Sequence, residues 1–435
     1  MTNKLDENSK NYAVIGAGAG GLCAAKTLRE NGVAATIFEI GSKVGGLWAY
    51  ENDSGRSPAY RSLHINSEAK VSSFVDFPFP EGTPLYPNTA HMEAYFNAYT
   101  DHFKLREHIR FRSEVSGLVS QGEKVWVELK SGERLLFDGV VVASGHQSIP
   151  RHPEEIKGFT GHYIHSHAYR VPTPYMDKRV VVMGLGNSGV DIAADVCSVT
   201  DATFVAVRSP VLVMPRMMFG APQSRTLVKV ERPFLPWRVR VWLRTTLTRI
   251  FHGRMEQWGL KTPKTRTHPI SHPTLIAHMA WGRVVARPGI KSAEGNTVTF
   301  TDGSVEQIDA IIAATGYLTD LPFIPADKNP LSGTWMNLYN RIVSPALPNV
   351  YFVGYFDVSG GSNIRMMDYQ SEYVAAIASG RLQLPPETEM LKAIAKDREW
   401  HCKQWPDRPR YGLELDTLHY LKTLKRDYRR LKPVK

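Results

Sequence analysis

The chain has 435 residues, 43% of them hydrophobic, and a formal net charge of +11, and this length allows two or three separately packed domains. No apolar run approaches the length of a membrane-spanning helix, and Met1–Lys10 lacks the apolar core of a secretory signal, so we expect a cytoplasmic protein. Cys23, Cys197 and Cys402 are widely separated, which argues against a disulfide framework, a redox cysteine pair and a zinc site. No metal site is predicted.

The first motif along the chain is a glycine-rich turn between a predicted strand at 12–15 and a predicted helix at 22–29. Its glycines are Gly16, Gly18 and Gly21. In such a turn the first glycine permits the sharp bend, the second lets the backbone approach a pyrophosphate, and the third allows helix and strand to pack closely. The motif therefore predicts a dinucleotide site at the helix N-terminus.

An acidic residue ends the next predicted strand. Glu39 closes the strand at 36–39 and lies 23 residues after Gly16. A carboxylate at this place can accept hydrogen bonds from a ribose diol. The first site is therefore expected to hold FAD or NAD.

A second glycine turn follows the predicted strand at 180–183 and precedes a predicted helix at 190–196, with Gly184, Gly186 and Gly189 in the same spacing. Here the next strand ends in Arg208, 24 residues after Gly184. A guanidinium suits the 2′-phosphate of NADPH, which a carboxylate would repel. Two such turns, one followed by an acidic and the other by a basic strand end, predict a flavin enzyme that is reduced by NADPH.

The remaining predicted elements suggest that one nucleotide domain is inserted in the other. A buried strand that ends in a small-residue turn is predicted at 139–146, and 308–317 nearly repeats it. We predict an α/β fold of two Rossmann-like domains of the three-layer ββα type. The expected boundaries are 1–150 and 310–380 for the FAD domain, 151–309 for the NADPH domain with an insertion at 210–274, and 381–435 for a basic helical tail.

Two segments carry most of the excess positive charge, the Arg-rich stretch 232–254 and the C-terminal stretch 421–435. Solvated faces are the favoured interpretation. Association of 236–244 with a membrane surface or an acidic partner stays open, although its arginines spread around a helical wheel. No nucleic-acid-binding motif is present, so no nucleic-acid partner is expected. The aromatic residues of 210–274 are candidates for a substrate wall, a homodimer interface or simple packing.

The segment between the two nucleotide motifs carries a family resemblance. Residues 159–170 read FTGHYIHSHAYR and resemble the FxGxxxHxxxY fingerprint of class B flavoprotein monooxygenases, in the form found in flavin-containing monooxygenases and N-hydroxylating relatives. Further matching pieces occur in order at 45–48, 60–66, 76–80 and 367–370, so the resemblance covers nearly the whole chain. The stretch 207–216 is also similar to the indole-pyruvate monooxygenase branch from plants.

The resemblance implies that NADPH reduces FAD, that dioxygen adds to the reduced flavin as a C4a-(hydro)peroxide, and that an amine nitrogen or sulfide sulfur of a small apolar or aromatic substrate is oxygenated. Asn66 matches the family's catalytic asparagine, whose amide donates a hydrogen bond near the flavin. The positions carried over to FAD binding are Gly16, Gly18, Gly21, Glu39, Leu47, Trp48, Val115 and Gln370. Those carried over to NADPH binding are Tyr169, Gly184, Gly186, Asn187, Ser188 and Arg208. The fingerprint residues Phe159, Gly161 and His165 are expected to organise the hinge between the domains.

Rival functions differ in what they require. A disulfide reductase of the same architecture needs a close cysteine pair, which the chain lacks. A Baeyer-Villiger monooxygenase, which oxidises ketones, has a fingerprint that ends in Trp followed by Pro or Asp, where this chain has Tyr169 and Arg170. Oxidative decarboxylation of an aromatic 2-oxo acid, and an NADPH oxidase or flavin reductase that releases hydrogen peroxide, remain alternatives.

Overall fold

The computed structural model describes residues 9–230, 235–268, 270–331, 335–358, 361–405 and 411–430. The chain forms two compact units, which we call the first and the second unit. The first comprises Met1–Ser57, Ser67–His146 and Thr319–Lys435, and the second comprises Pro58–Asn66 and Gln147–Leu318. In sequence, the second unit is therefore inserted in the first at two places.

The first unit is built on a parallel five-stranded sheet with the order β23-β7-β1-β2-β3. Its central strands are runs of small and β-branched apolar residues and are almost entirely buried, as expected of a parallel sheet that is covered on both faces. The strand bounds are Asn11–Ile15 (β1), Ala34–Phe38 (β2), Ile109–Arg110 (β3), Gly139–Val142 (β7) and Val350–Phe352 (β23).

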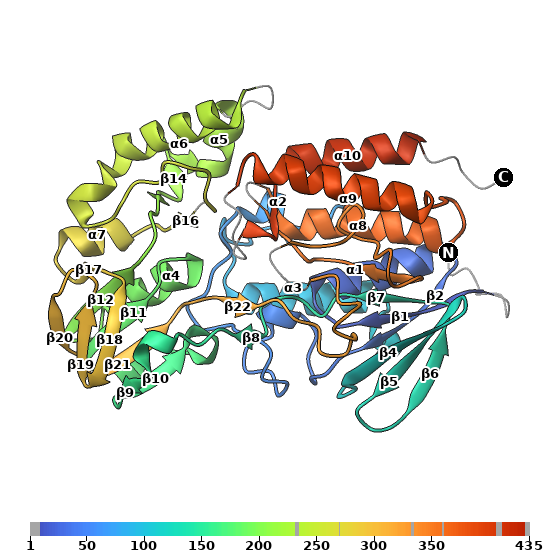
Figure 1. Cartoon of the computed structure of the whole chain (residues 1–435), viewed down its shortest axis with the longest axis horizontal. Helices are drawn as coiled ribbons and strands as arrows, with labels where there is room; N and C mark the ends of the chain where they lie inside the picture. Colours follow the sequence, from blue (N-terminus) through green and yellow to red (C-terminus); the bar gives the residue numbers. More distant parts are fainter. Residues whose placement is uncertain are drawn as a thin grey trace. The chain divides into compact units, whose positions relative to one another are not determined.

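Two further layers cover this sheet (Figure 1). Helix α1 (Ala19–Glu30) contacts β1, β2 and β7 and packs along α8 (Asn363–Ala378). On the other side lies an antiparallel meander of β4 (Val115–Gln121), β5 (Lys124–Leu129) and β6 (Arg134–Phe137). The side chains of alternate residues in β1 and β7 join those of β4 and β5 in one apolar cluster.

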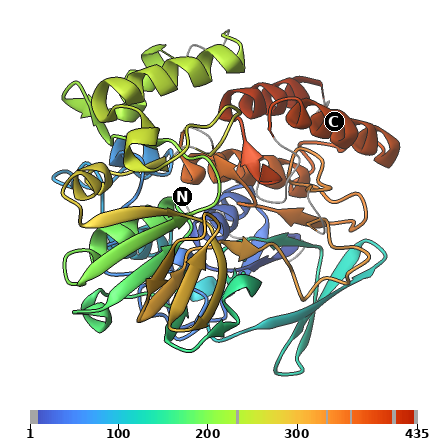
Figure 2. The same cartoon turned by 60° about the vertical axis from the view of Figure 1, so that its left-hand side comes forward.

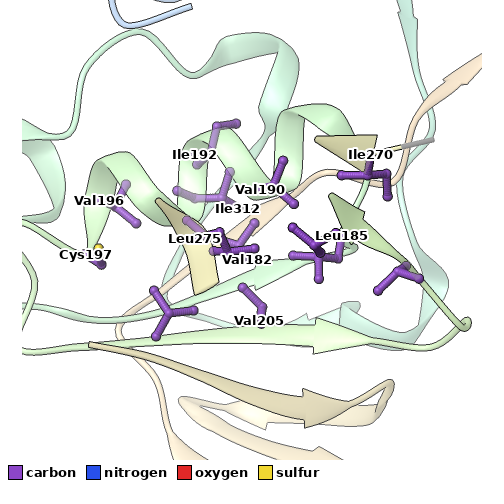
Figure 3. Packing of buried hydrophobic residues seen from close by; sticks show 14 of the residues in the cluster. Val182, Leu185, Val190, Ile192, Val196, Cys197, Val205, Ile270, Leu275 and Ile312 are labelled. Carbon is purple, nitrogen blue, oxygen red and sulfur yellow. The ribbon is translucent and has the colours of Figure 1, made fainter. Parts of the chain in front are cut away.

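The second unit repeats this layering on the parallel sheet β10-β21-β11-β12-β17. One face packs on an antiparallel meander (Figure 2), and the other packs on α4 (Asn187–Val196) and α7 (Leu275–Ala280), where Val182, Val205 and Ile312 meet Val190 and Leu275 (Figure 3). The predicted α/β class is confirmed. The strands are His162–His165 (β10), Arg179–Met183 (β11), Ala202–Val207 (β12), Val284–Pro288 (β17), Ile290–Gly295 (β18), Thr297–Phe300 (β19), Val305–Gln307 (β20) and Ala310–Ala313 (β21).

The two units differ from the expected domains in four stretches: 58–66, 147–150 and 310–318 lie in the second unit, and 381–435 is part of the first. Strand β21 pairs in parallel with β10 and β11 and so belongs to the second unit, although the FAD domain was expected to resume at residue 310. Strand β7 holds the corresponding place beside β1 in the first unit. The near-repeat of 139–146 at 308–317 therefore reflects equivalent strands in two similar sheets, and backbone pairing decides which sheet each strand joins.

The expected insertion at 210–274 contains two helices, α5 (Gln223–Val230) and α6 (Trp237–His252). The exposed side of α6 mixes Trp242 and Ile250 with Arg238 and Arg249, in agreement with the spread of arginines on the helical wheel. Residues 232–234 of the Arg-rich stretch, and 406–410 and 431–435 of the tail, lie outside the described residues. None of the helices in the described part of the chain has the length and apolarity needed to cross a membrane.

Shorter elements and the C-terminal helices complete the two units. In the first unit these are α2 (Ala69–Ser72), α3 (Thr89–His102), α9 (Glu387–Cys402), α10 (Thr417–Arg430), β24 (Asp357–Val358) and β25 (Glu414–Leu415). In the second unit they are β8 (Ile149–Pro150), β9 (Gly158–Phe159), β13 (Val213–Met214), β14 (Met217–Met218), β15 (Ala221–Pro222), β16 (Ile270–Ser271) and β22 (Tyr317–Leu318).

Candidate functional site

The glycine turn of the first unit joins β1 to α1. Gly16 has a φ of +101°, which favours glycine, and a Cβ atom on Gly21 would lie only 1.8 Å from the carbonyl oxygen of Gly16. Gly18 is the N-cap residue of α1, and no side chain of the described residues caps the first-turn amides. An uncapped helix N-terminus with several backbone donors fits a pyrophosphate.

Glu39 lies beside this turn, directly after β2. Its residue exposure is 5%, and its two carboxylate oxygens accept hydrogen bonds from the amides of Ala17 (2.7 Å) and Gly41 (2.8 Å). Burial raises the pKa of Glu39, and the two amide hydrogen bonds oppose that rise. The carboxylate is thus held at the glycine turn, where a ribose bound next to the pyrophosphate would present its hydroxyl groups.

The other residues expected near FAD divide into two groups. Leu47 and Trp48 lie on a short 3₁₀ turn, Gly46–Trp48, which approaches the glycine turn so closely that a Cβ on Gly18 would be 3.4 Å from the Cα of Gly46. Leu47 is exposed there and is available to a ligand. Val115 instead points its side chain into the apolar core, so any contact of this residue with a ligand would be through its backbone.

Gln370 is fully buried and its amide is used within the protein. Its Oε1 accepts from the amide of Gly354 (2.9 Å), and its Nε2 donates to the Tyr420 hydroxyl (3.0 Å) and the Arg341 carbonyl (3.3 Å). Gly354 follows β23 with a φ of +88°. Gln370 therefore holds the turn after β23, and a contribution to FAD binding would be indirect.

The second unit repeats the stereochemistry of the first turn between β11 and α4. Gly184 has a φ of +99°, and a Cβ on Gly189 would lie 2.2 Å from the Gly184 carbonyl oxygen. Gly186 is the N-cap residue of α4, and in the described part of the chain no atom lies within 4 Å of a built Cβ and no side chain caps the helix. The space in front of α4 is therefore open, as binding of a pyrophosphate requires.

Two of the residues predicted to bind NADPH lie at the start of α4, and a third follows the end of the adjacent strand β12. Asn187 and Ser188 begin α4, and the Oδ1 atom of Asn187 is buried without a hydrogen-bond partner in the described part of the chain. An orphaned acceptor of this kind fits a ligand donor. Arg208 directly follows β12, its side chain is 72% exposed, and its guanidinium is 3.9 Å from Glu155. A contact this long and solvated leaves the guanidinium available to a phosphate.

Tyr169, also expected near NADPH, is buried. Its hydroxyl donates to Asp195 (2.7 Å), which also accepts from Ser62 (2.7 Å), and its ring packs edge-on against Tyr60. Burial raises the pKa of Tyr169, and the neighbouring Asp195 adds to that rise. Tyr169 thus fastens the segment Pro58–Asn66 to α4, and its hydroxyl is already engaged within the protein.

Asn66 has an exposed side chain whose Oδ1 accepts a hydrogen bond from Arg216 (2.8 Å). Arg216 lies 3.6 Å from Asp191 on α4, and Asp191 in turn accepts from the Tyr60 hydroxyl (2.9 Å). The nearby His272 Nε2 lies 3.4 Å from the same carboxylate. Sequence reasoning assigned no role to Asp191 or Arg216, although a charged residue among the buried apolar positions of a helix is a signal that could have marked Asp191.

The fingerprint residues form a compact structural feature within the second unit. A Cβ on Gly161 would meet the Phe159 ring at 2.5 Å. The His165 Nδ1 accepts from the amide of His167 (3.1 Å), so its Nε2 carries the proton that is donated to the Gly316 carbonyl (3.1 Å). Burial lowers the pKa of His165 to about 4. With both ring nitrogens engaged, His165 ties β10 to the turn after β21.

Comparison with known proteins gives consistent matches across the chain. The family model described as flavin-binding monooxygenase-like matches residues 9–433. Flavin-containing monooxygenase 1 of Homo sapiens is 31% identical over 97% of this chain and 81% of its own length. The S-allyl-L-cysteine S-oxygenase of Allium sativum is 25% identical, with a TM-score of 0.71 over 98% of this chain and 90% of its own. NADP⁺-bound cyclohexanone monooxygenase from Rhodococcus sp. Phi1, at 17% identity, has a TM-score of 0.72 over 98% of this chain and 99% of its own.

Proposed function

The chain belongs to the flavin-binding monooxygenase-like family, and on that premise we propose which unit binds each cofactor and which role each site residue has. It is an FAD- and NADPH-dependent monooxygenase that acts on a nucleophilic heteroatom. We propose that the first unit holds FAD, that the second holds NADPH, and that the substrate is a small apolar or aromatic molecule with a sulfide sulfur or an amine nitrogen. The Allium sativum relative is an S-allyl-L-cysteine S-oxygenase, which supports including sulfur.

One observation carries this division of roles: two turns of matching stereochemistry are followed by side chains of opposite charge. Glu39, buried after β2, suits a ribose diol, whereas Arg208, exposed after β12, suits the 2′-phosphate of NADPH. Exchanging the cofactors would put a phosphate beside a buried carboxylate. The repulsion between them supports FAD in the first unit and NADPH in the second.

The chain's own residues then hold and orient the reactants. Gly16, Gly18 and Gly21 shape the turn that would receive the FAD pyrophosphate, with Leu47, Trp48 and the backbone of Val115 nearby, and Gln370 supports the turn after β23. Gly184, Gly186, Asn187 and Ser188 would do the same for NADPH. When bound and reduced, FAD supplies the activation of dioxygen. Asn66 is proposed to donate an amide hydrogen bond near the reacting atoms.

This assignment explains why few titrating groups are needed. A soft nucleophile such as a sulfide attacks an electrophilic oxygen without prior deprotonation. The protein mainly supplies position, hydrogen bonds and exclusion of water. His165 agrees with this interpretation, because both of its ring nitrogens are used within the second unit. A cytoplasmic location is part of the proposal, and a homodimer and membrane association are alternatives that the sequence left open.

The test uses purified protein loaded with FAD, NADPH and ¹⁸O₂. The probes are methyl phenyl sulfide, N,N-dimethylaniline, phenylacetone and an aromatic 2-oxo acid. We expect a sulfoxide or N-oxide that carries one labelled oxygen atom, with close to one product per NADPH. An ester from the ketone would indicate Baeyer-Villiger chemistry, and loss of carbon dioxide would indicate the 2-oxo acid reaction. Hydrogen peroxide equal to the NADPH consumed, with every probe unchanged, would contradict the proposed heteroatom substrate.

A further inference from the structure

A buried charged cluster in the second unit has no role in the assignment above. It consists of Arg216, Asp191, Tyr60 and His272, and Arg216 reaches from it to Asn66. We propose that Arg216, held by Asp191, is a positioning residue that fixes which end of the Asn66 amide faces the reacting groups. This inference rests on the proposed role of Asn66, which the experiment below tests separately.

The chemistry of the two groups determines the orientation. A guanidinium carries only donors, whereas a carboxamide has an acceptor end and a donor end. At 2.8 Å from Arg216, the amide of Asn66 must turn its oxygen toward the guanidinium. The NH₂ group then faces away with two donors available to an oxygen atom of a ligand. Charge assistance makes this contact worth about a 10- to 100-fold preference over the flipped amide.

Without this contact the orientation would be poorly defined. The Asn66 side chain is exposed at the end of the segment Pro58–Asn66, where water can hydrogen-bond to either end of the amide. The Arg216 side chain is only 8% exposed. A buried anchor can therefore impose one orientation on an exposed amide.

Arg216 is itself held in place from several segments. The carboxylate of Asp191, 11% exposed, lies 3.6 Å from the same Nη2 atom that donates to Asn66. The second oxygen of Asp191 accepts from the Tyr60 hydroxyl at 2.9 Å. The His272 Nδ1 accepts from the amide of Leu275 (2.9 Å), so its Nε2 carries a proton and points toward Asp191. The segment Pro58–Asn66, through Tyr60, and the residues after β16, through His272, thus converge on the Asp191 carboxylate of α4, which faces the Arg216 guanidinium.

The charges in this cluster balance near neutral pH. Burial raises the pKa of Asp191 to about 6, and Arg216 is the main influence that opposes the rise, so the carboxylate is ionised above that pH. Burial, followed by repulsion from Arg216, lowers the pKa of His272 to about 3, so this imidazole is neutral. His64 and Asp195 also act on Asp191, in opposite directions. The Arg216 guanidinium therefore faces the ionised carboxylate of Asp191 and donates to the Oδ1 atom of Asn66.

The experiment changes the hydrogen-bonding groups of residue 216 and measures what fraction of the oxidised NADPH yields oxygenated product. Arg216→Gln places a group of either polarity beside Asn66, and Arg216→Lys keeps a donor-only cation. The readout is coupling, the fraction of NADPH that yields oxygenated methyl phenyl sulfide rather than hydrogen peroxide. We expect coupling to fall about 10-fold or more in Arg216→Gln and to recover substantially in Arg216→Lys.

Asn66 variants separate the inference from the function on which it rests. Asn66→Asp keeps an acceptor for Arg216 but has no NH₂ group, so it should lose coupling as fully as Asn66→Ala. The double variant Asn66→Ala with Arg216→Gln should be no worse than Asn66→Ala alone, because Arg216 acts through Asn66. Normal coupling in Asn66→Ala would remove the proposed role of Asn66. Normal coupling in Arg216→Gln, with Asn66→Ala impaired, would overturn the positioning role only.

Binding measurements exclude a merely structural effect. Because Asp191 lies on α4, whose first turn is the proposed nucleotide site, NADP⁺ affinity of the oxidised holoprotein is measured by calorimetry for every variant. FAD content and melting temperature are measured alongside. We expect the NADP⁺ affinity of Arg216→Gln to change by less than about 2-fold, well below the 10-fold loss of coupling. If Arg216→Gln does not fold, Arg216→Lys together with Asn66→Asp still decides the question. Full coupling in Asn66→Asp would overturn it.

Discussion

Gly186→Ala offers the sharpest test of the nucleotide site in the second unit. Gly186 has φ −86° and ψ −171°, an extended backbone that alanine adopts readily. Among the described residues, no atom lies within 4 Å of the added Cβ. The substitution is therefore tolerated by the protein itself, and any large effect on NADPH must come from the ligand. Gly189→Ala is not an equivalent test, because its Cβ would lie 2.2 Å from the Gly184 carbonyl oxygen.

The expected magnitudes follow from these surroundings. Replacing glycine by alanine at a compatible backbone geometry stabilises a protein by about 0.4–1 kcal/mol, and the poorer N-cap residue offsets a similar amount. Stability should therefore change by less than about 1 kcal/mol. A methyl group in front of the α4 amides would displace a pyrophosphate from one or two charge-assisted hydrogen bonds. Each of these is worth about 1.5–3 kcal/mol, so the affinity for NADP⁺ should fall at least about 10-fold.

The assay is calorimetric titration of NADP⁺ into the FAD-loaded protein, with FAD content and melting temperature recorded in parallel. Gly18→Ala is the matched variant in the first unit, where a Cβ would lie 3.4 Å from the Cα of Gly46. It should reduce FAD content. Gly186→Ala should leave FAD content unchanged and weaken NADP⁺. Equal NADP⁺ affinity in wild type and Gly186→Ala would refute the placement of the pyrophosphate at the N-terminus of α4.

The remaining predictions concern Arg208 and His165. Arg208→Ala should lower kcat/KM for NADPH about 10- to 100-fold and leave NADH nearly unaffected, because only NADPH carries the 2′-phosphate; equal losses with both nucleotides would remove Arg208 from that site. The pKa of His165 is about 4 in the folded protein and 6.5 ordinarily, so its contribution to stability is complete above pH 6.5 and is lost as the pH falls toward 4, by at most about 3 kcal/mol. In His165→Gln residue 165 does not titrate, so the melting temperature should fall less between pH 6.5 and 4 than in the wild type. The same pH dependence of the melting temperature in variant and wild type would argue against a buried neutral imidazole.

Much of the architecture was predictable because its signals are local. The sequence of each nucleotide unit contains an apolar run, a glycine turn and a helix in that order. The observed strands and helices begin and end within a few residues of the expected bounds. The charge at the end of the next strand is equally local, since Glu39 and Arg208 each follow their strand directly. The family resemblance rested on the same kind of information, short motifs in a fixed order.

The structure altered the interpretation of residues whose partners are distant in sequence. Gln370 and Tyr169 matched positions expected to bind a cofactor, but their polar atoms hydrogen-bond to Gly354 and Asp195 respectively. The sequence alone could not reveal these bonds. A motif identifies the type of side chain at a position and not the group that this side chain meets after folding.

The sequence by itself determined the α/β class, the two nucleotide units and the pair of cofactors, because strand, turn and helix signals and the charges beside them act over a few residues. Only the tertiary structure decided that β21 joins the second sheet and that Arg216 contacts Asn66, 150 residues away. Parallel strand pairing and buried ion pairs form between segments that meet only when the core closes. They leave no periodic pattern in either segment, so the orientation of the Asn66 amide is a property of the folded second unit.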